Sequence, residues 1–254
     1  MPLDYDALER ALATMGATLP PEPDQWPRYV EQLGVSEADA PMLLELVKSW
    51  ADPEHFERFA GNDDAVFAPV HAWRTLAQLR VPAVVDGMLA LLVELETQDD
   101  ELAAADLSAV AECVGAAAIA PLRAFAAAAG SPDRARAAAI TALEWFATED
   151  TALRAELLPV WLAALERCEP TARSSNAAVV AALVAWRMPE TIDTVRKAFA
   201  AGALDEDELG SFNDVAVALG VRERWATRNH GGHAKDKRAR KREKQARKAN
   251  RKRR

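Results

Sequence analysis

The stretch "HAWRTLAQLRVPAVVDGMLALLVEL", residues 71–95, decides the fold. On either side of its Pro82, apolar residues recur at i, i+4, i+7 and i+11, the spacing of one face of a helix. Proline cannot continue a helix but is tolerated at the start of the next, so Pro82 predicts a tight break between two helices. The apolar positions are Val66, Val70, Trp73 and Ala77 before the break, and Val84, Met88, Leu91 and Leu95 after it.

Helix pairs of the same kind follow along the chain. The first helix of each pair is expected to end near Arg80, Gly115, Thr148 and Met188, at intervals of 35, 33 and 40 residues. This period is typical of HEAT, armadillo and related α-solenoids, and an irregular helical bundle is the alternative. The later apolar stripes are Leu107, Val110 and Val114; Ile119, Leu122 and Phe125; Ile140, Leu143 and Phe146 or Ala147; Leu158, Trp161 or Leu162, and Leu165; Val180, Leu183 and Arg187; and Ile192, Val195 and Phe199.

Capping signals mark the predicted helix ends. Residues 52–54 (Asp-Pro-Glu) and 131–133 (Ser-Pro-Asp) each place a capping oxygen before a proline at the first helical position. Ser211 and Asp214 have the spacing of a capping box, and Gly220 predicts a helix C-terminus. Together with the abundance of Ala, Leu and Glu and only 11 Gly, these signals predict an all-α protein.

We therefore expect an α-solenoid of HEAT-like helix pairs with a disordered or partly helical basic C-terminal tail. The predicted divisions are an N-terminal helical segment (1–35), the repeat array (36–221) and the tail (222–254). Two stretches carry a family resemblance. Residues 71–95 resemble a bacterial HEAT-like repeat, and "AFAAGALDEDELGSFNDVAVALGV", residues 198–221, resembles the last unit of a family of bacterial HEAT-like proteins of uncharacterised function.

The resemblance implies a helical-repeat fold over roughly residues 36–221. Some members of that family carry a Cys-rich zinc module of the SEC-C type after the array. This chain has no Cys after Cys168, so no role of that module is expected here. The basic tail stands in its place.

Charge divides the chain sharply. Residues 222–254 hold 16 Lys and Arg against 3 acidic residues, about +13, whereas the other 221 residues hold 15 against 36, about −21; together they give the net charge of -8. Such asymmetry points to a tail that seeks polyanions or the body of its own chain. The predicted polyanion-binding residues are Lys235, Lys237, Arg238, Arg240, Lys241, Arg242, Lys244, Arg247, Lys248, Arg251, Lys252, Arg253 and Arg254.

Beyond Gly231-Gly232 the tail has no apolar residue larger than Ala and no aromatic residue. It therefore lacks the groups that insert into membranes or stack on bases, and sequence-independent phosphate contact remains. RNA, DNA or the ribosome surface would satisfy that chemistry. A solubilising tail, or one docked on the acidic body, is the alternative.

Nothing in the sequence points to an enzyme. Of four His, none is followed by Glu, as the ligands of HEAT-like di-iron hydroxylases require, and no P-loop, G-x-S-x-G or G-x-G-x-x-G sequence occurs. We predict no catalytic residue, cofactor or metal site. His71 is interpreted as a polar or boundary residue on a structural helix, and His230 and His233 as linker residues with weak metal affinity. A HEAT-like lyase or small-ligand binder with a pocket between repeats is the alternative.

Cys113 and Cys168 lack metal-binding or disulfide spacing and are expected to be reduced and buried. The N-terminus does not resemble a signal peptide. The most apolar run, 81–95, is interrupted by Asp86 and Glu94, so we expect no membrane span and a cytoplasmic location.

Aromatic and acidic residues are the remaining candidates for contact surfaces. Five Trp are predicted in or beside the core: Trp50, Trp73, Trp145, Trp161 and Trp186. Trp26 and Trp225 lie off the repeats and could dock a terminal segment on the array. The acidic clusters 63–64, 99–101, 149–150 and 205–208 are interpreted as solvated turns and helix N-termini, or as a docking ridge if they share an edge.

These features favour a non-enzymatic scaffold whose array binds a protein partner and whose tail binds polyanions. The second hypothesis is the enzyme or small-ligand binder. The third is self-regulation, with the tail docked on the acidic body. The sequence alone does not fix the oligomeric state.

Overall fold

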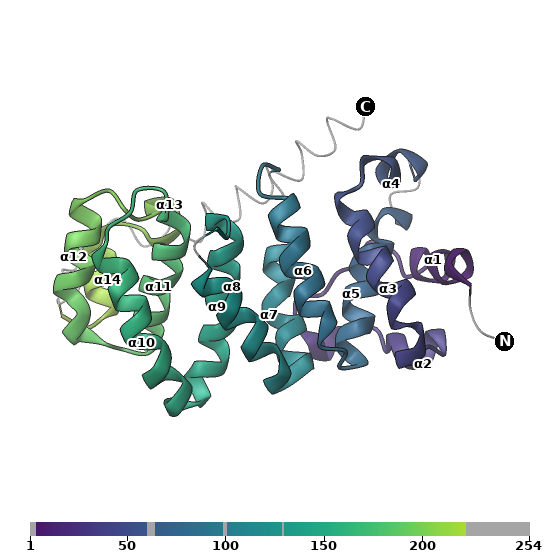
Figure 1. Ribbon diagram of the computed structural model, residues 1–254, viewed down its shortest axis with the longest axis horizontal. Helices are drawn as coiled ribbons and strands as arrows, with labels where there is room; N and C mark the ends of the chain where they lie inside the picture. Colours follow the sequence, from purple (N-terminus) through teal and green to yellow (C-terminus); the bar gives the residue numbers. More distant parts are fainter. Residues whose placement is uncertain (1–3, 60–63, 99–100, 129, 222–254) are drawn as a thin grey trace, which may run out of the picture.

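The computed structural model describes residues 4–59, 64–98, 101–128 and 130–221 (Figure 1). These residues form helices and no strand, which confirms the all-α prediction. The α-helices are α1 (Tyr5–Ala13), α2 (Tyr29–Leu33), α3 (Ala40–Lys48), α4 (Pro53–Arg58), α5 (Ala68–Gln78), α6 (Ala83–Glu94), α7 (Leu102–Val114), α8 (Ile119–Ala127), α9 (Asp133–Glu149), α10 (Thr151–Glu166), α11 (Arg173–Ala185), α12 (Ile192–Ala200), α13 (Glu206–Leu209) and α14 (Phe212–Ala218). Short 3-10 turns are η1 (Pro23–Gln25), η2 (Glu37–Asp39), η3 (Ser49–Ala51), η4 (Ala65–Phe67), η5 (Gly115–Ala118) and η6 (Pro189–Thr191).

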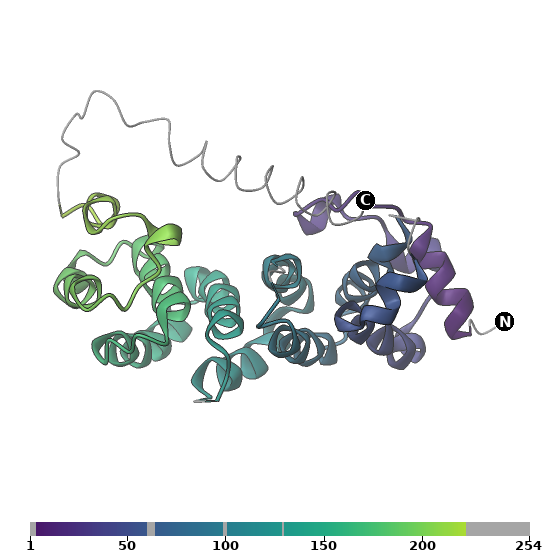
Figure 2. The same cartoon turned by 90° about the horizontal axis from the view of Figure 1, so that it is seen from above.

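The helices follow one another in an elongated row from α1 to α14 (Figures 1 and 2). Helix α3 packs on α5, α5 on α7, α7 on α9, and α9 on α11. Helices α6, α8 and α10 lie against this series, and α12 packs on α10 and α14. The contacts join elements that are near one another in the chain, so each helix is held mainly by its neighbours.

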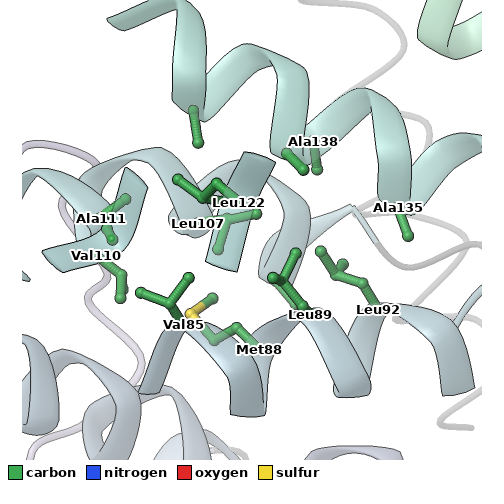
Figure 3. Close-up of a cluster of buried hydrophobic side chains, with 14 of the residues drawn as sticks. Val85, Met88, Leu89, Leu92, Leu107, Val110, Ala111, Leu122, Ala135 and Ala138 are labelled. Atoms are coloured by element: carbon green, nitrogen blue, oxygen red, sulfur yellow. The ribbon is translucent and has the colours of Figure 1, made fainter. Parts of the chain in front are cut away.

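The middle of the row shows how the core is built (Figure 3). Side chains of α6, α7, α8 and α9 meet between the two series of helices, and Met88, Leu107 and Leu122 are fully buried there. Alanines such as Ala135 and Ala138 face them from α9. Small side chains let neighbouring backbones approach closely, so the abundance of alanine reflects the packing of this row.

The predicted apolar stripes are largely buried. All eight positions around residues 66–95 are buried, as are Leu107, Val110 and Val114. Other predicted positions are less buried than expected. Six predicted positions are only partly buried because they lie beside turns or at the edge of the interface: Ile119, Phe125, Phe146, Leu158, Ile192 and Phe199. Arg187 is exposed and lies past the end of α11, so it does not belong to that stripe.

The same turn follows α5 and α11. Arg80 and Arg187 adopt left-handed backbone conformations, with φ of 55° and 54°. Behind them, the Val81 N–H donates to the Leu76 carbonyl at 3.1 Å, and the Met188 N–H donates to the Leu183 carbonyl at 3.0 Å. This is the Schellman pattern, and a proline follows one residue later in both turns. The two turns are therefore alike in backbone conformation and hydrogen bonding.

Most predicted caps are present. Asp52 accepts the Glu54 N–H at 2.9 Å, and Ser211 and Asp214 form the predicted capping box. Gly220, with φ of 77°, follows α14 as expected. The prediction for Ser131 is wrong, because its hydroxyl donates to the Phe125 carbonyl instead of capping α9.

Neighbouring helices supply caps across the row. Glu96, which follows α6, accepts the Arg134 N–H of α9 at 3.3 Å. Asp133 of α9 accepts the Ser174 and Ser175 N–H groups of α11 at 2.7 and 3.0 Å. Because the first backbone N–H groups of a helix lack internal partners, these carboxylates tie the N-terminus of α9 to the end of α6 and the N-terminus of α11 to α9.

One described stretch, Leu102–Ala127, has the length and hydropathy of a membrane span, and is longer than the apolar run 81–95 noted in the sequence. Gly115, with φ of 80°, divides it into α7 and α8. Leu107 and Leu122 of these helices are fully buried against their neighbours. Packing within the row therefore accounts for the apolar character of this stretch, which is weak evidence for a span.

The strained turn gives a stability prediction. Replacing Arg187 with Gly removes the steric cost of a side chain in the left-handed region, offset in part by the greater freedom of the unfolded chain. We expect Arg187→Gly to stabilise the protein by about 0.5–1 kcal/mol in urea unfolding. Arg187→Ala keeps the Cβ and should change little; equal effects of the two variants would contradict this account.

Candidate functional site

A buried ion pair joins α5 to α7. Arg74, 1% exposed, donates from Nε and Nη2 to the two Asp106 oxygens at 2.7 and 2.9 Å. The Trp73 Nε1–H donates to the same carboxylate at 2.8 Å. Asp106 thus receives three hydrogen bonds in a buried site. A bidentate Arg–carboxylate pair is strong there because its two parallel hydrogen bonds are charge-assisted.

The Arg74 guanidinium also contacts the N-terminal segment. Its Cζ lies 4.8 Å from the centroid of the Trp26 ring, a cation–π arrangement. The Trp26 indole N–H donates to the Pro20 carbonyl at 3.0 Å. Trp26 is buried and docks the N-terminal segment on the row, as the sequence suggested.

His71 extends this network. Its Nε2 lies 2.8 Å from the Gly16 carbonyl, and its Nδ1 lies 2.8 Å from the Tyr29 hydroxyl. The carbonyl can only accept, so Nε2 carries the proton and Nδ1 accepts from Tyr29. Burial lowers the pKa of His71 and raises the pKa of Tyr29 to about 12. His71 is fully buried, deeper than the predicted boundary position, and serves to fix the N-terminal segment.

His55 occupies a second buried polar site, between α1 and α4. Its Nε2–H donates to the Val66 carbonyl at 3.2 Å, which leaves Nδ1 facing Glu9 Oε1 at 3.8 Å. Glu9 Oε2 accepts from Arg58 at 3.1 Å. Burial is the main cause that lowers the pKa of His55. The hydrogen bonds of both histidines to backbone carbonyls therefore tie neighbouring segments together, which is a structural role.

The sequence interpretation missed the Arg74–Asp106 pair. A signal was present: Arg74 follows the stripe residue Val70 by four positions, and Asp106 precedes Val110 by four. Each charge therefore falls on the buried face of its own helix. Opposite charges on the buried faces of two packed helices need each other as partners. This pattern in the sequence could therefore have predicted the Arg74–Asp106 pair.

Two hollows lie on the surface of the row. The first, about 360 Å³, is formed by the N-terminal halves of α7, α9 and α11 and is bordered by α6 and α13. We call it the α7–α9–α11 groove. Its walls are mostly alanine: Ala104, Ala105, Ala135, Ala137, Ala138, Ala177, Ala178 and Ala181. Glu96, Glu101 and Glu208 contribute carboxylates and Arg134 a cation.

The second hollow, about 560 Å³, lies between α8 and α10 with α9 and α11 as its floor. Four of its charged groups form two pairs, Arg123 with Glu156 at 2.7 Å and Arg167 with Glu169 at 2.8 Å, and Arg136 donates to the Ala128 and Ser131 carbonyls. At the floor, the Ser175 hydroxyl bonds to Asp133. These polar groups are engaged within the protein, so they do not converge on a site for a small molecule.

The acidic clusters do not share one edge. Glu101 and Glu208 meet at the α7–α9–α11 groove, whereas Glu149 and Asp150 lie at the opposite end of α9. Asp150 caps α10 by accepting the Ala152 N–H at 2.9 Å. Glu101 and Glu208 therefore lie close to helix N-termini and Asp150 has a capping role, whereas Asp63, Asp99 and Asp100 lie outside the described residues.

Aromatic and sulfur side chains refine the predicted core. Trp50, Trp73, Trp161 and Trp186 are buried as predicted, but Trp145 is 42% exposed, so the prediction for it is wrong. Trp145 lies at the edge of its helix face and packs against Phe146. The two cysteines are free and only partly buried, and burial raises the pKa of Cys113.

The basic residues 235–254 assigned to polyanion binding, with Trp225, His230 and His233, lie outside the described residues. Within residues 4–59, 64–98, 101–128 and 130–221, no group of three or more His, Cys, Asp or Glu is placed to hold a metal ion.

Comparisons of the chain with protein-family models, with curated proteins and with solved structures found no match.

The buried pair predicts a large mutational cost. Asp106→Asn keeps the shape of the side chain but leaves Arg74 as an uncompensated buried charge. We expect a loss of about 3–5 kcal/mol in the free energy of unfolding, measured with urea. Glu156→Gln, which breaks an exposed ion pair, serves as the control and should cost less than about 1 kcal/mol. Equal costs would show that the buried pair does not hold α5 to α7.

The buried histidines predict acid sensitivity. Because burial lowers the pKa of His55 and His71 in the folded state, the unfolded chain takes up protons first as the pH falls. Their contribution to stability is fully present above the ordinary value of 6.5 and is lost as the pH falls below it. Urea midpoints should therefore decrease from pH 7.5 to 5.5, and His71→Gln should weaken that dependence. A midpoint that rises on acidification would contradict the assignment of neutral imidazoles.

Proposed function

We propose that this protein is a non-enzymatic cytoplasmic scaffold: a HEAT-like α-solenoid that binds a protein partner, with a tail that binds RNA or DNA without sequence preference. The observation that carries the proposal is the separation of charge. About +13 is concentrated in residues 222–254, on a chain whose remaining residues sum to about −21. Phosphate backbones are attracted to the first and repelled by the second.

The solenoid part of the proposal rests on repetition. The series α3, α5, α7, α9 and α11 packs in chain order, and the turns at Arg80 and Arg187 are alike in conformation and hydrogen bonding. Caps from Glu96 to α9 and from Asp133 to α11 join each of these helix N-termini to an earlier helix of the row. These features are expected of helix pairs that bury their apolar faces against the next pair.

A small-ligand or lyase-like function has less support. Such a site needs polar groups that converge on a bound molecule. In the α8–α10 hollow the arginines pair with neighbouring glutamates, and the α7–α9–α11 groove is walled by alanine. An extended surface of this kind suits a polypeptide partner better than a small molecule.

The tail is tested with the full-length protein. Binding to poly(U) and to a duplex DNA of random sequence should be measured at 50 mM and 200 mM salt after nuclease treatment. We expect binding to both, falling at least about 100-fold between these salts, because six or more phosphate contacts release counterions. A full-length variant with the thirteen Lys and Arg of residues 235–254 changed to Gln should lose binding to both nucleic acids.

A tail with the same composition in shuffled order is the matched control. It should bind as well as the natural tail, since the proposed contact reads charge and not sequence. Binding by the natural tail alone, or no loss in the Gln variant, would overturn the proposal.

A further inference from the structure

The α7–α9–α11 groove has an unusual combination of walls and rim. Its walls are alanine side chains from three helices whose N-terminal halves lie side by side. Among the described residues that line it, Glu96, Glu101 and Glu208 carry carboxylates and Arg134 carries a positive charge. We propose that this groove is the docking site for the Lys/Arg-rich segment 235–254 of the same chain, and that RNA or DNA competes for that segment. The competition rests on the proposed function; the docking itself does not.

Glu96 gives the groove a group in need of a partner. Its Oε1 accepts the Arg134 N–H, and its Oε2 has no hydrogen-bond partner among the described residues. This oxygen is shielded from solvent, so a donor reaches it only when the partly exposed Glu96 side chain turns toward the groove. A carboxylate oxygen is an acceptor only, so the group that completes it is a donor. Lysine and arginine side chains offer three and five N–H donors respectively.

The alanine walls of the groove also suit the Lys/Arg-rich segment 235–254. Apart from Ala, the segment 235–254 has no apolar side chain, so it cannot fill a deep apolar pocket. Lys and Arg can instead lay their methylene stems along a shallow alanine surface while their charged heads reach the rim. Alanine walls leave room for the approaching backbone that larger side chains would occupy.

The chain can reach the groove. The described part of the protein ends at Val221, directly after α14, and α13 with Glu208 borders the groove. Fourteen residues lead from Val221 to Lys235, a span of up to about 46–50 Å. A tethered segment is held at high effective concentration, so weak electrostatic contacts suffice to seat it.

Other occupants fit less well. A second copy of the groove would bring like charges together, and a nucleic acid would be repelled by the carboxylates. An apolar helix would offer neither a donor to Glu96 Oε2 nor a positive charge to the groove carboxylates. A basic segment matches both the charge and the hydrogen-bonding needs of the groove.

Carbodiimide cross-linking of the full-length protein tests the contact directly. The reagent joins a lysine to a carboxylate in direct contact, and six of the eight lysines of the chain lie in residues 235–254. At low salt, we expect cross-links from these lysines to concentrate on Glu96, Glu101 or Glu208. They should decrease at 500 mM salt, where charge interactions are screened. An equal mixture of ¹⁴N- and ¹⁵N-labelled protein distinguishes links within one chain from links between two.

A pair of variants makes the test specific. Glu101→Gln with Glu208→Gln removes two carboxylates of the groove, and we expect the tail cross-link to Glu96 to fall about five-fold. Glu149→Gln with Glu166→Gln removes two exposed carboxylates elsewhere and should leave it unchanged. Circular dichroism confirms that both proteins keep their helices. Equal effects of the two pairs, cross-links spread evenly over the body, or links mainly between chains would each overturn the proposal.

Measurements with poly(U) distinguish docking of the tail in the groove from nucleic-acid binding by the tail. Poly(U) should displace the tail and lower the groove cross-links, and it should bind the Glu101→Gln/Glu208→Gln variant more tightly than the unaltered protein. Binding of poly(U) with no groove cross-links would leave the proposed function standing and the docking wrong. Groove cross-links without poly(U) binding would support docking and contradict the proposed function.

Discussion

The apolar face of each helix in this protein can be buried only by the helices beside it, and this constraint organises the structure. Neighbour packing from α3 to α11 extends the core along the row. The ends of the helices are then held by neighbours as well, through the carboxylates of Glu96 and Asp133. Stability is therefore expected to be distributed along the row, with the middle helices held from both sides.

The Arg74–Asp106 pair fixes one interface within that row. Apolar faces slide past each other at small cost, whereas a buried bidentate ion pair satisfies its charges in one geometry. Trp26 and His71 connect the same region to the N-terminal segment, so α1 and α2 are held by polar contacts as much as by apolar ones. This polar network is structural, and it explains why His71 is buried without requiring a catalytic role.

Apolar periodicity and proline breaks were enough to predict helices and most buried positions, because these depend on local spacing. Contacts between repeats were not predictable in the same way. The failed cap at Ser131 and the exposed Trp145 depend on how α9 meets its neighbours. The groove likewise arises only when the starts of α7, α9 and α11 come side by side, and no single helix carries its signature.

The protein is an acidic row of helices joined to a basic tail. Each helix of the row is stabilised by the helices adjacent to it. Hydrogen exchange of the full-length protein, followed by mass spectrometry, tests this most directly. Protection should be highest in α7 and α9 and decrease toward α1 and α14, because terminal helices have a neighbour on one side only. Uniform protection from α1 to α14, lost in a single transition, would contradict the claim and indicate one cooperative globular core.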